Sequence, residues 1–95
     1  MKNSLDIIIN RAKIDIEQVV KERFFTNTKK IVFNRYIQVG DTDYDTAKEL
    51  KLKNGKVYAY FPNYMEQYAW KHLTELSIDK MYKLITDINF YGYTF

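Results

Sequence analysis

The sequence predicts an α+β fold, in which an N-terminal helix and one or two C-terminal helices pack on one face of an antiparallel sheet of three to four strands. Apolar residues recur at helical spacing from Ser4 to Phe24, and again after Pro62. Between these segments, two alternating runs flank Asn54-Gly55, which is the strongest short hairpin signal. Amphipathic helices need an apolar surface to cover, so residues 1–95 should form a single small domain of two layers.

Composition limits the classes of function. The 95 residues carry a net charge of +3, which allows nucleic acid or an acidic protein surface as a partner without requiring either. The lack of Cys removes disulfides, thiolate zinc sites and cysteine nucleophiles, and it suits a reducing cytoplasm. The apolar stretch between Met1 and Ile9 is too short for a signal sequence or a membrane span. We therefore expect a cytoplasmic protein with no cofactor and no membrane partner.

The predicted N-terminal helix has one apolar stripe that should pack on the sheet. Ile7 and Ile14 fall off this stripe, and they either widen the buried face or meet a second subunit in a homodimer. The wider buried face is the preferred reading. The stripe consists of Leu5, Ile8, Ile9, Ala12, Ile16, Val19 and Val20.

A first strand is predicted after the polar break at Thr26 to Lys30. Its inward residues are expected to be Ile31, Phe33, Ile37 and Val39. Arg35 interrupts this alternation, and an inward Arg is too costly to bury unpaired. A bulge, an edge position that lets the guanidinium reach water, or a carboxylate partner would each resolve the conflict.

The pair Asn54-Gly55 predicts a type I′ turn, because both of its central positions need positive φ. The register of the hairpin follows from the turn, and it gives one apolar face and one basic, aromatic face. The predicted cross-strand pairs are Lys53–Lys56, Leu52–Val57, Lys51–Tyr58, Leu50–Ala59 and Glu49–Tyr60.

Pro62 ends the hairpin, and a helix is expected from Asn63 to Leu76. Asn63 followed by Glu66 is a capping-box arrangement, and the buried stripe would be Met65, Ala69, Leu73 and Leu76. Ser77 should cap a second helix, or a bent continuation, with Met81, Tyr82, Ile85 and Ile88 inside. The segment Asn89 to Phe95 should be a short terminal strand or an ordered tail, in which Tyr91, Tyr93 and Phe95 form either a core strand or a binding patch.

Few residues suggest a metal or catalytic site. His72 is the only His, and on a helix with no second ligand it should be half-buried or facing solvent. The alternating residues Asp41, Asp43 and Asp45 are similar to the start of an EF-hand loop. That loop needs Gly and Glu where this chain has Thr46 and Leu52. We therefore expect no metal, and an acidic loop that could meet a Lys/Arg-rich partner.

One pattern points to an enzyme. Asp45 followed by Glu49-Leu50-Lys51, together with the predicted order of elements, resembles the core of the restriction-endonuclease-like nucleases. The resemblance implies two carboxylates that hold Mg²⁺ and a Lys that orients water. In that family, Glu-x-Lys usually lies on the strand after the hairpin turn, where this chain has neither residue in Val57 to Phe61. Nuclease activity is therefore the third hypothesis.

The outward hairpin face is the main candidate for binding. Cations and flat rings on one sheet suit single-stranded nucleic acid, and Tyr is also enriched at protein interfaces. The same pattern is ordinary packing on a solvent-exposed face. The candidate residues are Lys51, Lys53, Lys56, Tyr58 and Tyr60, with Tyr36 nearby and Lys29, Lys30 and Arg35 as further neighbours, and then the acidic residues Asp41, Asp43 and Asp45.

The sequence thus favours a small, non-enzymatic binding protein. Lys, Ile, Asn and Tyr are abundant, as in AT-rich genomes, and small Cys-free chains are common in bacteriophages and mobile elements. The leading expectation is a phage protein that inhibits a host protein or nucleoprotein complex, with an anti-CRISPR role as one instance. The alternative is a nucleic-acid-binding module that uses the basic hairpin face.

Overall fold

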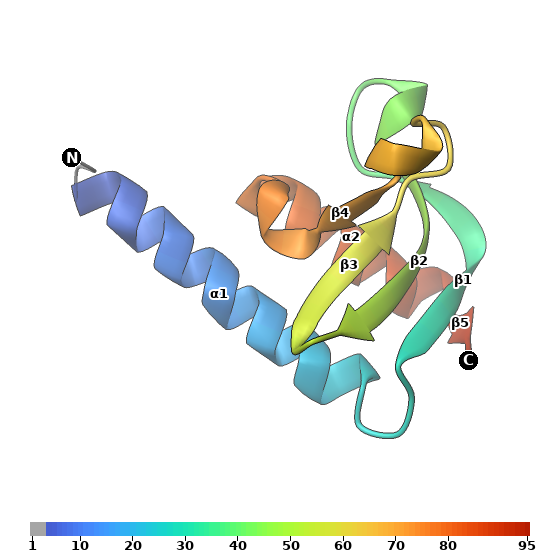
Figure 1. Ribbon diagram of the computed structural model, residues 1–95, viewed down its shortest axis with the longest axis horizontal. Helices are drawn as coiled ribbons and strands as arrows, with labels where there is room; N and C mark the ends of the chain where they lie inside the picture. The colour runs from blue at the N-terminus through green and yellow to red at the C-terminus, as the bar shows by residue number, and fades with distance from the viewer. Residues whose placement is uncertain (1–3) are drawn as a thin grey trace.

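Two helices and a five-stranded antiparallel sheet form an α+β fold in the computed structural model, which describes residues 4–95 (Figure 1). The sheet has the strand order β4-β3-β2-β1-β5, with one strand more than the upper end of the predicted range. Three short 3₁₀ helices lie in the connections, at Asp43–Asp45, Glu66–Tyr68 and Leu73–Glu75. The main elements are α1 (Ser4–Phe24), β1 (Lys30–Gln38), β2 (Thr46–Lys53), β3 (Lys56–Tyr60), β4 (Trp70–His72), α2 (Ile78–Tyr91) and β5 (Tyr93–Thr94).

The hairpin between β2 and β3 confirms the predicted turn and register. Asn54 and Gly55 have φ values of 53° and 76°, as a type I′ turn requires. All five predicted cross-strand pairs, from Glu49–Tyr60 to Lys53–Lys56, are present. The turn also contacts α1, because Lys21 Nζ donates a hydrogen bond of 2.8 Å to the Gly55 carbonyl.

The interruption at Arg35 is confirmed as a shift of register in β1. Between the pairs Val32–Glu49 and Ile37–Ala47, four residues of β1 face one residue of β2. This irregularity lets Phe33 and Ile37 both enter the core while Arg35 stays exposed. The Arg35 guanidinium carbon lies 4.7 Å from the ring centroid of Tyr91. The partner of Arg35 is therefore an aromatic ring, in place of the carboxylate that was one of the three expectations.

The core lies between the sheet and α2, which runs behind β2 and β3 in Figure 1. Ser77 caps α2 as predicted, because its Oγ accepts a hydrogen bond from the backbone N–H of Lys80. Tyr82 was expected inside but is 58% exposed. The fully buried side chains of α2 are Met81, Leu84 and Ile88.

The predicted helix from Asn63 to Leu76 is wrong. Residues 66–75 instead form two 3₁₀ turns and the edge strand β4, which pairs with β3. Asn63 does not cap a helix, and its Nδ2 donates a hydrogen bond to the Asp43 carbonyl. The open edge of β3 explains the difference, since pairing with residues 70–72 satisfies backbone groups that a helix would leave unpaired. Ala69, Leu73 and Leu76 are buried as predicted, while Met65 is exposed.

Helix α1 ends at Phe24 as predicted, but it does not bury the predicted stripe. Its fully buried residues are Glu17, Val20 and Phe24. Figure 1 shows its N-terminal half extending beyond the sheet, so apolar side chains in this half do not pack on the sheet. Ile7 and Ile14 are exposed too, so the expected wider buried face is wrong. Leu5, Ile8 and Val19 are exposed, and Ile9, Ala12 and Ile16 are only half-buried.

The predicted terminal strand is confirmed in a shorter form. Helix α2 continues to Tyr91, and only Tyr93–Thr94 pair with β1, as the antiparallel strand β5. Tyr93 packs edge-on against Phe24 at a centroid distance of 5.2 Å, whereas Phe95 is exposed. The C-terminal aromatic residues are therefore divided between the core and the surface.

The turn supplies a test of the register. A Cβ built on Gly55 meets no atom within 4 Å, so Gly55→Ala adds only the cost of a positive φ. We expect a loss of about 1 to 2 kcal/mol in the free energy of unfolding, measured by urea denaturation. The matched variant Gly55→Asn should lose much less, because Asn tolerates the left-handed region. Equal losses in the two variants would contradict the type I′ turn.

Candidate binding surface on the open face of the sheet

The sheet face opposite α2 carries a cluster of rings and cations that comes from three strands. Two cross-strand rows build it, because side chains of directly paired residues point to the same face. One row is Lys51–Tyr58–His72, and the other is Glu49–Tyr60–Trp70. The open-face cluster is defined here as Lys51, Tyr58, Tyr60, Trp70 and His72.

Within the open-face cluster, the side chains contact one another closely. The rings of Tyr60 and Trp70 are 4.9 Å apart, and those of Tyr58 and His72 are 5.6 Å apart. Lys51 Nζ lies 3.9 Å from the ring centroid of Trp70 and 5.9 Å from that of Tyr58. These contacts hold the half-buried side chains in place before any partner arrives, which lowers the entropy lost on binding.

A shallow hollow lies beside this cluster at the turn end of the hairpin. It is lined by Lys51, Lys53, Asn54, Tyr58 and Trp70. Its lining thus combines aromatic rings with cations, which suits a side chain or loop that carries negative charge.

The structure brings together part of the predicted binding set. Lys51, Tyr58 and Tyr60 lie in the open-face cluster, and Lys53 and Lys56 are exposed as a pair beside the turn. Three predicted residues are therefore central and two lie at the rim.

The other predicted residues lie elsewhere. Tyr36 is exposed on β1, where Lys48 Nζ is 4.8 Å from its ring centroid. In the acidic loop, Asp41 and Asp43 are exposed, while Asp45 pairs with Lys80 of α2 at 3.7 Å. The acidic loop is therefore a separate surface, and one of its three carboxylates has a structural partner.

Sequence reasoning missed Trp70 and His72, because it placed both on a helix. The available signal was the alternation of Tyr68, Trp70 and His72, which is typical of a strand. His72 is half-buried, as expected, but it lies on β4. Because the His72 ring lies beside Tyr58, the aromatic surface extends from the hairpin onto β4.

A chain of hydrogen bonds joins this surface to α1. Glu17 is 7% exposed, and its Oε2 accepts the backbone N–H of Val57 at 2.8 Å. The same oxygen lies 2.6 Å from His72 Nε2, and His72 Nδ1 lies 2.9 Å from Thr74 Oγ1. The order hydroxyl, imidazole, carboxylate is also that of a catalytic triad. Here the carboxylate additionally binds the main chain of β3, so its evident role is to attach α1 to the sheet.

The acidic residues of the nuclease-like pattern have separate cationic partners. Glu49 pairs with Lys30 at 3.1 Å, whereas Asp45 pairs with Lys80. Across residues 4–95, no group of three or more His, Cys, Asp and Glu side chains is arranged to hold a metal ion. The geometry therefore offers no support for the metal site that the resemblance implies.

Comparisons of the chain with protein-family models, curated proteins and solved structures found no match. In the described part of the chain, no helix combines the length and the hydropathy that a membrane span needs.

Substitution of Glu17 tests whether this residue attaches α1 to the sheet. Glu17→Ala would leave a buried N–H of Val57 without its acceptor and His72 without its partner, so we expect a loss of about 2 to 4 kcal/mol in the free energy of unfolding. Glu17→Gln keeps an acceptor oxygen, and it should lose clearly less. The control is Glu22→Ala, which removes an exposed carboxylate of the same helix and should change stability little. A loss with Glu17→Ala no larger than that of the control would contradict the anchoring role.

Proposed function

We propose that this chain is a non-enzymatic binding protein that recognises a partner protein through its open-face cluster. The observation that carries the proposal is that Trp70 contacts both Lys51 and Tyr60 on the sheet face opposite the helix that covers the core. Trp and Tyr are enriched among the residues that dominate binding energy at interfaces, where rigid side chains lose little entropy.

Charge indicates the chemistry of the partner. Lys30, Lys51, Lys53 and Lys56 belong to the strands that build this face, and the nearest acidic member of the two rows, Glu49, is already paired with Lys30. Once Glu49 is paired with Lys30, the lysines Lys51, Lys53 and Lys56 give this face a net positive charge. A partner with an acidic surface would therefore be attracted toward the rings. Binding of this kind should weaken as salt rises, but it should persist through the aromatic contacts.

The concrete form of the proposal is inhibition of a host protein or nucleoprotein complex by a small protein of phage or mobile-element origin. Inhibition by occupancy requires only that the chain cover a surface that its target uses, and no reaction centre is needed. Anti-CRISPR-like counter-defence is one instance of this mode. The aromatic surface supports this form of the proposal, because it offers an area that can cover part of a target.

Single-stranded nucleic acid is the second candidate, and the same Lys excess favours it. Base stacking needs a free ring face, and each stacked base contributes about 1 to 3 kcal/mol. The ammonium of Lys51 already lies 3.9 Å over the ring of Trp70, so a base would have to displace it. For this reason a protein partner is preferred.

The preferred function is tested by affinity capture from a host extract, followed by measurement of the affinity for the captured protein. Trp70→Ala should weaken that affinity at least tenfold, because it removes the central ring and the support of Lys51. Phe90→Ala is the matched control, since Phe90 is an exposed aromatic residue on α2. Equal effects of the two variants would show that binding does not use the open face.

The nucleic-acid alternative makes a different prediction. Affinity for a labelled single-stranded oligonucleotide should fall steeply between low and moderate salt, and Lys53→Glu should reduce it sharply. A protein inhibitor of the proposed kind should ignore the oligonucleotide. Strong, salt-sensitive binding that depends on Lys53 would therefore replace the preferred function with the second.

A further inference from the structure

Helix α1 carries an apolar stripe that its own sheet does not cover. Leu5, Ile8 and Val19 are 62%, 63% and 55% exposed, and Ala12 and Ile16 are half-buried. At 100° per residue, these five positions lie on one side of the helix, next to the side that buries Glu17, Val20 and Phe24. Exposed aliphatic residues in one continuous stripe are typical of an interaction surface.

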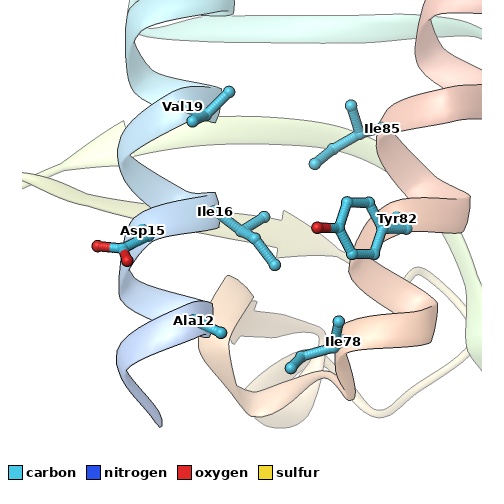
Figure 2. A pocket seen from close by; sticks show the side chains of 7 residues that line it. All are labelled: Ala12, Asp15, Ile16, Val19, Ile78, Tyr82 and Ile85. Carbon is cyan, nitrogen blue, oxygen red and sulfur yellow. The ribbon is translucent and has the colours of Figure 1, made fainter. Parts of the chain in front are cut away.

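This stripe borders an apolar groove of about 500 Å³ between α1 and α2. Figure 2 shows Ala12, Ile16 and Val19 directed toward Ile78, Tyr82 and Ile85 of α2, while Asp15 points the other way. The groove is open along α1, and its walls are the side chains of two helices. Its shape and chemistry fit a third amphipathic helix.

The spacing of the stripe identifies that third helix. The residues Leu5, Ile8, Ala12, Ile16 and Val19 are separated by three, four, four and three positions, which is the same pattern in both directions. A second copy of α1, antiparallel and crossing at Ala12, therefore places Leu5 against Val19 of the second copy and Ile8 against Ile16. Such self-complementarity is what a two-fold symmetric interface requires. The small side chain of Ala12 at the centre lets the two helices approach closely.

The shape of the protein allows this arrangement. The N-terminal half of α1 extends beyond the sheet, and α1 is about 30 Å long at 1.5 Å per residue (Figure 1). In an antiparallel pair, each projecting half would lie over the groove of the other copy.

We infer that the protein forms a two-fold symmetric homodimer, in which two α1 helices cross antiparallel at Ala12 and each places Leu5 and Ile8 in the groove of the other copy. A stable interface usually buries about 800 Å² per partner, which a helix of this length with an adjoining groove can supply. The open-face cluster belongs to another surface, so the dimer would present two clusters at once and could bind a repeated or symmetric target with added avidity.

Cysteine substitution tests the geometry, because the chain contains no Cys of its own. Ala12→Cys places two thiols at the two-fold axis, so mild oxidation should convert most of the protein to a covalent dimer. Ile14→Cys is the control, because Ile14 is exposed on the opposite side of α1. A mixture of Leu5→Cys and Val19→Cys variants should cross-link as a heterodimer. Cross-linking of Leu5→Cys with itself would show a parallel pair and overturn the proposal.

Light scattering tests the state of the unmodified chain. We expect twice the chain mass of 11.5 kDa over a series of concentrations, and a single chain mass for Leu5→Glu. Leu5 is 62% exposed in the single chain, so this variant should keep the circular dichroism of the folded chain. Ile14→Glu should remain a dimer. A monomeric wild type, or a dimer that survives Leu5→Glu, would overturn the proposal.

Discussion

A buried carboxylate determines how the long helix meets the sheet. Glu17 accepts the N–H of Val57 just beyond the end of β4, so one side chain continues the hydrogen bonding along the edge of β3. A buried carboxylate needs partners, and His72 supplies the second. These two bonds set the rotation of α1 about its axis, and Val20 and Phe24 follow Glu17 into the core. The aliphatic stripe is thereby turned away from the sheet, which is why the most apolar side of the helix is left at the surface.

Strand β4 links this anchor to the open-face cluster. It has only three residues, yet it closes the edge of β3 and places Trp70 beside Tyr60 and His72 beside Tyr58. A very short edge strand also offers little template for unwanted pairing with another chain. His72 contacts the open-face cluster through its ring and Glu17 through Nε2, so the surface and the attachment of α1 share one residue. Disturbing the anchor should therefore also loosen the ring that supports Tyr58.

Local signals in the sequence predicted the parts of the fold that local chemistry decides. The C-terminal end of α1, the hairpin register and the cap at Ser77 depend on nearby polar, turn and capping residues, and all three are confirmed. The segment 63–76 depends instead on a distant strand edge, and its buried residues Ala69, Leu73 and Leu76 fit a helix equally well. The rotation of α1 depends on a polar contact across 40 positions, which apolar periodicity cannot reveal. For the same reasons Lys51, Tyr58 and Tyr60 of the open-face cluster were predicted. Trp70 and His72 were missed, because the helical interpretation of residues 63–76 concealed their strand-like alternation.

Exposure of the apolar stripe of α1 to water is unfavourable in free energy, which is why we infer that a partner covers it. Each exposed aliphatic side chain leaves apolar surface in water, and a continuous stripe also invites non-specific association. Lys or Glu could replace Leu5 and Ile8 without disturbing the core, because both side chains are exposed in the single chain. Instead the aliphatic positions repeat symmetrically about Ala12, and the groove beside them is apolar as well. Random exposure does not require that symmetry, whereas a pair of antiparallel helices does, and the pairing leaves the open-face cluster free for a different partner.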